Sequence, residues 1–196
     1  MRTPLTLALS LVVGTSGCST VEPPKLEGSP ANSALVLVDC DVQNVQALFN
    51  THARIGQVEG LLGGQGTPPP SHHGWSLDGA GLLVFSDVEP GRWTLTSLRA
   101  AFRSNLSTNL ANEALAAQGL VEQLTIETRA GEPVYLGVVK VEEIFTGISK
   151  PEVHVTLERR PKAESEAWNR ILAAYKDSAW NEPIRKRLAS LAASGG

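Results

Sequence analysis

Apolar and polar residues alternate along several stretches of the chain. The even-numbered positions from Ala34 to Val42 are all apolar. The odd-numbered positions of the same stretch end in Asp39 and Asp41. This period of two predicts a strand with one buried face, which includes Cys40. The two aspartates are then expected to keep the opposite face hydrated.

Six later stretches also have the length and composition of strands. They are Arg54–Glu59, Leu82–Val88, Arg92–Arg99, Leu120–Thr128, Val134–Phe145 and Val153–Arg159. The tripeptide Glu89–Gly91 supplies a tight turn between two of them. About seven short strands with turn residues between them predict a mostly β fold, an antiparallel sandwich.

The tail changes to the period of a helix. Apolar residues fall three or four positions apart over Trp168–Tyr175 and again over Trp180–Leu191, and Pro183 fits the first turn of the second helix. We expect a C-terminal helical hairpin that docks on the sheet, because an exposed stripe this apolar would aggregate. The alternative is a helix that binds a partner.

One short helix is expected within the β region, over Leu110–Gln118. Asn109 is its expected N-cap, and Gly119 stands where a glycine commonly follows a helix. The predicted fold is therefore a β-sandwich with one inserted helix and a helical tail.

The N-terminus has the plan of a secretory signal. Arg2 precedes the apolar run Leu5–Val13, and small residues lead from there into Cys18. The apolar run is far shorter than the ~20 residues that span a bilayer. The segment Thr15–Cys18 resembles the lipobox of bacterial lipoproteins, with Thr15 where that motif usually has leucine.

The lipobox resemblance implies cleavage after Gly17 and acylation of Cys18 on sulfur and nitrogen. Several acyl chains hold a protein firmly on a membrane. Ser19 stands where inner-membrane retention usually shows aspartate, so the resemblance favours the outer membrane. An ordinary signal peptide followed by a chance cysteine is the alternative.

The chain then divides into four parts. They are a signal peptide (1–17), a lipidated cysteine with a proline-rich tether (18–32), the β domain (33–160) and the helical segment (161–196). A flexible tether of this length would reach about 20 Å.

A second resemblance lies within the β region. The run Asp87–Leu95 resembles the strand entry of carboxypeptidase-regulatory-like and transthyretin-like sandwiches, with Trp93 where that pattern usually has tyrosine. The run Ala130–Gly137 resembles a later strand entry of bacterial lipoproteins, and Tyr135 is expected to form a tyrosine corner with nearby backbone. These modules are typically non-catalytic, so the resemblance implies an Ig-like or transthyretin-like fold and no catalytic residue.

Composition and charge exclude several functions. The 196 residues carry a formal charge of −3, and their basic residues form no surface suited to nucleic acid. The cluster Gly60–Gly66 lacks the Gly-Lys-Ser/Thr ending of a phosphate loop, which argues against nucleotide binding. Cys40 is left unpaired once Cys18 is lipidated, and we expect it to be a buried, inert hydrophobe.

The histidines predict neither a metal site nor a catalytic site. His52, His72 and His73 have no ligand-type spacing, and adjacent histidines on a strand point in different directions. Ser71 and His72 lie in no Gly-x-Ser-x-Gly elbow. A hydrolase or metalloenzyme is therefore the remote alternative, and no cofactor is expected.

Gly60–Gly81 is the most informative stretch for function. It combines many glycines with Pro68–Pro70, and it predicts a long loop that carries His72, His73 and Trp75. Such a loop would suit recognition of an envelope protein or glycan. The alternative is a mobile loop with Trp75 folded onto the core.

The expected function is that of a non-catalytic envelope lipoprotein, anchored to the membrane by lipid on Cys18. An accessory subunit of a secretion machine is the alternative, since the outer-membrane lipoprotein of the type VI system is also a small transthyretin-like sandwich.

Overall fold

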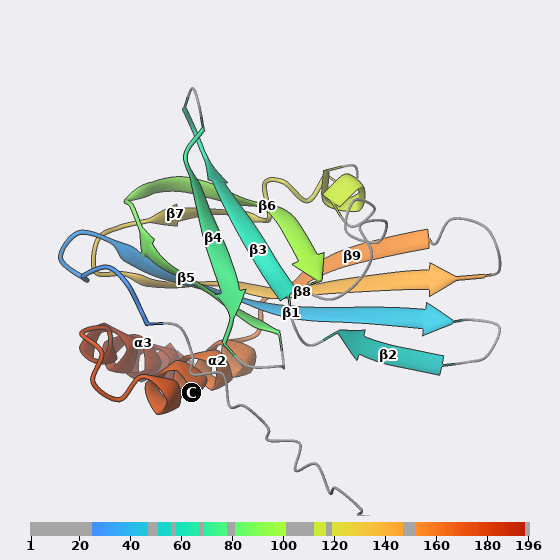
Figure 1. The fold of residues 1–196 in the computed structure, drawn as a ribbon. Coiled ribbons are helices and arrows are strands. Elements are labelled where there is room, and N and C mark those ends of the chain that lie inside the picture. Colours follow the sequence, from blue (N-terminus) through green and yellow to red (C-terminus); the bar gives the residue numbers. More distant parts are fainter. Residues whose placement is uncertain are drawn as a thin grey trace, which may run out of the picture.

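The computed structural model describes most of the chain after its first 24 residues. The described residues are 25–46, 51–55, 58–66, 69–77, 81–100, 112–116, 119–146 and 152–194. The signal peptide, Cys18 and the expected cap Asn109 lie outside them. Among the described helices, none is long and apolar enough to cross a membrane. The fold is mostly β, as the sequence predicts (Figure 1).

The described strands form one mixed sheet. They are β1 (Ala34–Gln46), β2 (Thr51–Ile55), β3 (Val58–Gly64), β4 (Ser71–Ser76), β5 (Leu82–Val88), β6 (Gly91–Ala100), β7 (Thr125–Thr128), β8 (Pro133–Phe145) and β9 (Glu152–Glu158). Their order is β7-β6-β3-β4-β5-β1-β8-β9, and β2 pairs with β1. The purely antiparallel expectation is wrong, because β1 and β8 run parallel.

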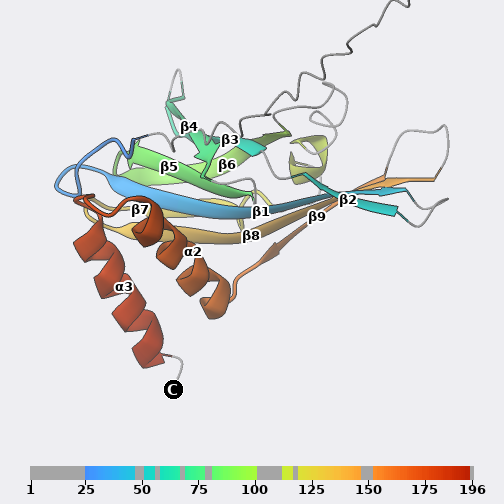
Figure 2. The same ribbon diagram turned by 60° about the horizontal axis from the view of Figure 1, so that its bottom comes forward.

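The sheet curls into a half-barrel, and β4 makes the corner (Figures 1 and 2). β4 pairs with β3 along four residues but with β5 at only two positions, Trp75 with Val84 and Ser76 with Leu83. One section of the sheet, β7-β6-β3, therefore turns away from the other, β5-β1-β8-β9. Side chains from both sections meet between them.

These side chains form the inner core of the domain. It includes the even positions of β1 from Ala34 to Val42, together with Phe85, Trp93 and Leu95. Cys40 is 1% exposed within it, which confirms the predicted buried face of β1. Burial, and secondarily the charge of Asp39, raises the pKa of the Cys40 thiol. The thiol is therefore protonated and inert at ordinary pH.

Glycines make the corner possible. Gly60 of β3 and Gly74 of β4 are direct cross-strand partners. A Cβ atom on Gly74 would lie 2.5 Å from the Phe85 ring, and one on Gly60 would lie 2.8 Å from it. The two glycines thus form a flat surface on which the Phe85 ring packs. The backbone approaches the ring more closely there than any side chain would allow.

Two helices cover the outer face of the β5-β1-β8 section. They are α2 (Pro161–Ala174) and α3 (Asn181–Ser194) (Figure 2). Leu35 and Leu37, at odd positions of β1, pack under them with Trp168, Ile171 and other residues. We call this second core the helix-side cluster. Docking of the tail on its own sheet is therefore confirmed, and the first part of β1, residues 34–38, is buried on both faces.

A polar contact also ties α2 to the sheet. The Arg170 guanidinium binds the Asp39 carboxylate at 3.0 Å, and the Tyr135 hydroxyl donates to the other carboxylate oxygen, also at 3.0 Å. Two expectations are corrected here. Asp39 is not a solvent-facing residue, because α2 covers its face of β1. Tyr135 bonds to a side chain and does not form a tyrosine corner with the backbone.

The stretch before β7 differs from its prediction. The expected helix is described at residues 112–116, and Gly119 has the left-handed φ of +66° common after a helix. The strand expected over Leu120–Thr128 is shorter, because residues 121–124 form turns and only Thr125–Thr128 is β7. Leu120 and Leu124 anchor these turns in the inner core.

Residues 25–32, expected within the tether, lie against the domain, which was expected to begin at Ser33. Leu26 packs on the helix-side cluster, and the Glu27 N–H donates to Ser86 Oγ at 3.3 Å. The Gly131 N–H donates to the Ser33 carbonyl at 2.9 Å. The part of the predicted tether that could extend away from the domain is therefore limited to the residues before Lys25.

Candidate functional site

The stretch Gly60–Gly81 contains a β-hairpin, so the prediction of one long loop is wrong. β3 and β4 account for most of its described residues, and they pair from Gly60–Gly74 to Gly63–Ser71. The glycines that suggested a loop provide room for large rings, since a Cβ on Gly64 would lie 2.9 Å from the Trp93 indole. Close packing is the physical reason for this composition.

The hairpin does not bring the three candidate residues together. His72 shares the inner face of β4 with Gly74, whereas His73 is exposed on the outer face. Trp75 packs on the helix-side cluster, which agrees with the alternative of an indole folded onto the core. The side chain of His52 lies outside the described residues.

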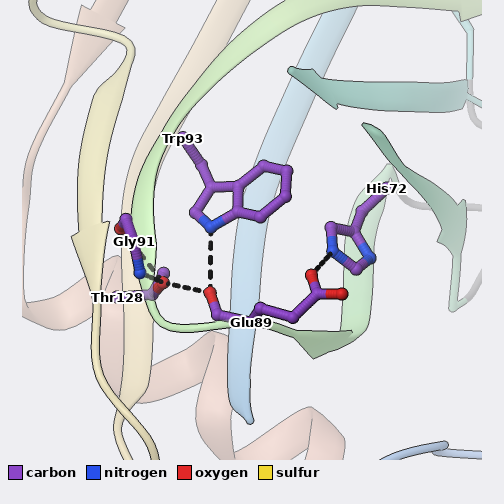
Figure 3. A network of polar contacts seen from close by, with 5 residues as sticks. All are labelled: His72, Glu89, Gly91, Trp93 and Thr128. Atoms are coloured by element: carbon purple, nitrogen blue, oxygen red, sulfur yellow. Dashed lines mark hydrogen bonds and ion pairs between the residues drawn. The ribbon is translucent and has the colours of Figure 1, made fainter. Parts of the chain in front are cut away.

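His72 belongs to a polar network at one end of the half-barrel, which we call the rim network (Figure 3). Its Nε2 atom lies 2.5 Å from Oε2 of Glu89. The imidazole also meets the Trp93 indole edge to face, with ring centroids 4.6 Å apart. Trp93 is 4% exposed and fixed in the core, so its contact with the imidazole holds the His72 ring in place.

Thr128 completes the rim network and fixes the β5–β6 turn. The Glu89 carbonyl accepts hydrogen bonds from Trp93 Nε1 at 2.9 Å and from the Thr128 hydroxyl at 2.8 Å. The same hydroxyl accepts the Gly91 N–H at 3.1 Å. The turn predicted at Glu89–Gly91 is confirmed, and buried partners satisfy its backbone groups.

The hydroxyl of Thr128 in the rim network bonds to main-chain groups of Glu89 and Gly91. Within the described ranges, no group of three or more His, Cys, Asp or Glu residues could hold a metal ion.

Replacement of His72 by phenylalanine is expected to raise the pKa of Glu89. The hydrogen bond from His72, with a smaller effect of backbone, holds that pKa below the ordinary 4.5. The unfolded chain binds this proton more tightly, so the pair stabilises the fold above about pH 4.5 and loses that effect as the pH falls through the lowered pKa. The stability change is small, because the Glu89 side chain is 67% exposed.

Carboxyl titration by carbon NMR measures this pKa in both proteins. Phenylalanine keeps the aromatic contact with Trp93 and removes only the hydrogen bond. His73→Phe, at the exposed neighbouring position, is the control and should leave Glu89 unchanged. An equal Glu89 pKa in wild type and His72→Phe would show that the hydrogen bond between His72 and Glu89 does not form in solution.

A groove of about 440 Å³ lies on the outer face of β3 and β6. Leu61 and Gly63 form part of its floor, and they alternate with inward-facing core residues. We call it the hairpin groove. Its lining residues are Leu61, Gly63, Gly64, Gln65, Pro69, Pro70, Ser71, Thr94, Thr96 and Val121.

Sequence reasoning missed two sides of the hairpin groove. Val121 forms one wall and is 49% exposed, which is unusual among the large apolar residues that the structure describes. Thr94 and Thr96 come from β6, which was predicted as a strand over Arg92–Arg99. The alternation of Thr94 and Thr96 with core residues was visible, but nothing in the sequence shows that β6 lies beside β3.

Comparison with protein-family models, with curated proteins and with solved structures gives no match to this chain.

Proposed function

We propose that the chain is a non-catalytic envelope lipoprotein that holds a partner in the hairpin groove. The observation that carries this proposal is an open, mostly apolar groove with an exposed valine in its wall. Exposed apolar surface in a concave site is typical of binding sites. Most of the groove is formed by residues of the paired strands β3, β4 and β6, so little ordering would be lost on binding.

An extended peptide segment is the occupant that best fits the hairpin groove. Its floor combines glycine backbone with the Thr94 and Thr96 side chains, and its walls present Val121 and two prolines. Small residues and backbone suit a flat, extended chain. Glycan sites usually offer an aromatic ring for stacking, and no aromatic side chain is among the lining residues of this groove.

Substitution of Thr96 by arginine is expected to abolish partner capture, because a long charged side chain would fill the hairpin groove. Thr156→Arg is the matched control, since Thr156 is also an exposed threonine on a strand, β9, and does not line the groove. The measurement is crosslinking in intact cells followed by mass spectrometry. The proposal requires an envelope protein that wild type and Thr156→Arg both capture and Thr96→Arg loses.

Equal capture by all three proteins would overturn the groove as the binding site. Recovery of a glycan alone would keep the groove as the binding site but would overturn the peptide as its occupant.

The second part of the proposal is anchoring by lipid on Cys18, with the outer membrane as the location. It is supported by the signal-like N-terminus and by the lipobox resemblance. Cys18→Ser is expected to move the protein from the membrane fraction into the soluble fraction or to leave it unprocessed. Cys40→Ala is the control, because it removes the other cysteine of the chain and should keep the acyl chains.

Mass spectrometry of the mature protein is the direct measurement. An unmodified Cys18, or a mature chain that starts elsewhere, would overturn the anchor. It would leave the hairpin groove untouched.

We also propose a kinship of the β domain with Ig-like or transthyretin-like sandwiches. Support comes from the inner core, which draws side chains from both sections of the curled sheet. The parallel pair β1–β8 is a departure from those purely antiparallel sheets.

A further inference from the structure

A second groove, of about 390 Å³, lies between the turn that joins β7 to β8 and the exposed side of α3. We call it the α3 groove. Its lining residues are Arg129, Ala130, Gly131, Glu132, Pro133, Pro183, Lys186, Arg187 and Ser190. The groove is thus rich in basic residues, although the whole chain carries a charge of −3.

The basic residues of this groove differ in whether they form an ion pair. Arg187 is committed to Glu164, with Nε at 2.7 Å and Nη2 at 3.2 Å from the two carboxylate oxygens. For Arg129 and Lys186, by contrast, no ion pair is found within the described part of the chain. Glu132 is the single acidic side chain in the lining.

Residues 30–33 of the N-terminal segment border this groove. The Gly131 N–H binds the Ser33 carbonyl, and a Cβ on Gly131 would lie 3.1 Å from the Pro30 carbonyl oxygen. Residues Cys18 to Lys25 can span at most about 25 Å when fully extended. A membrane that held Cys18 would therefore lie within a short distance of the segment that borders the α3 groove.

We propose that the α3 groove binds the phosphate groups of anionic phospholipids in the membrane that holds Cys18. An arginine can bind phosphate through two N–H groups, and a lysine adds a point charge. The inference rests on the proposed lipid anchor, because the anchor raises the local lipid concentration and lets a weak site be occupied. It gives the domain a fixed orientation on the lipid surface.

The test uses mature, acylated protein in vesicles of phosphatidylcholine, with or without one third phosphatidylglycerol. Amide hydrogen exchange is measured at residues 129–133 and 183–190. Phosphatidylglycerol is expected to slow exchange there by several-fold. Each charge near an anionic surface contributes about fivefold to the binding equilibrium, so Arg129→Gln with Lys186→Gln should remove the effect. Lys162→Gln, an exposed lysine of α2 outside the groove, is the control.

The outcomes separate the anchor from the groove. Vesicle flotation on phosphatidylcholine alone tests the anchor, and a protein that does not float would overturn both proposals. A protein that floats but exchanges equally in the two kinds of vesicle would overturn the α3 groove and leave the anchor intact. If added inorganic phosphate slowed amide exchange at the groove without phosphatidylglycerol, the ligand would be a soluble anion, and the proposal of lipid binding would be overturned.

Discussion

Trp168→Ala is expected to lower the free energy of unfolding by about 3–5 kcal/mol. Trp168 is fully buried in the helix-side cluster, where α2 packs on β1. Its removal would leave a large cavity that the rigid sheet cannot close. The indole N–H also donates to Glu164 Oε1 at 3.2 Å. The variant would therefore also remove one hydrogen bond from the buried carboxylate that binds Arg187.

Urea unfolding followed by circular dichroism measures this loss. Asn169→Ala is the control, because Asn169 is the exposed neighbour on the same helix and should change stability by less than about 0.5 kcal/mol. Trp168→Phe should fall between the two. A loss below about 1 kcal/mol for Trp168→Ala would mean that α2 does not dock on the sheet in solution.

Gly74→Val is expected to destabilise the fold by about 3 kcal/mol. The new side chain would start 2.5 Å from the Phe85 ring, and Gly60 leaves the ring no room to move toward β3. Either β4 must move away from β5, to which only two residue pairs hold it, or the Phe85 ring must move off the two glycines. Both responses open the corner of the half-barrel.

A double-mutant cycle with Phe85→Leu tests this mechanism. The smaller side chain should recover part of the loss, so that the two changes together cost less than their sum. His73→Val is the control, since His73 is the exposed neighbour of Gly74 on β4. Additive losses would show that the destabilisation arises elsewhere, for example from the strand backbone.

The sequence predicted the elements whose burial follows a simple period. The even face of β1 is buried as expected, and β5, β6, β8 and β9 begin and end within a residue or so of their predicted bounds. The apolar stripes of α2 and α3 are equally correct. In each of these elements, burial of one face determines which positions are apolar. The spacing of apolar residues in the sequence is therefore enough to predict the element.

The errors arise where residues distant in sequence decide the local structure. Gly60 and Gly74 are glycines because Phe85 lies on them, and a composition rich in glycine otherwise indicates a loop. Asp39 looked like a solvent-facing residue because its partner, Arg170, comes from a helix at the far end of the chain. No local pattern encodes such pairs.

The candidate site was predicted only in part. The opposite directions of His72 and His73 follow from strand geometry and are confirmed. The partners of His72 were not foreseen, since Glu89 comes from a turn and Trp93 from the next strand. Val121, in the wall of the hairpin groove, lies in a stretch that was expected to be a strand.

The parallel pairing of β1 with β8 has a consequence for the order of folding. Leu37 pairs with Tyr135, so the central strand of the sheet finds one of its neighbours only after roughly 100 further residues have been made. Loop closure over such a distance is slow, and high contact order predicts folding in milliseconds to seconds. Until β8 has been made, the edge of β1 that pairs with it stays open to pairing with another extended strand.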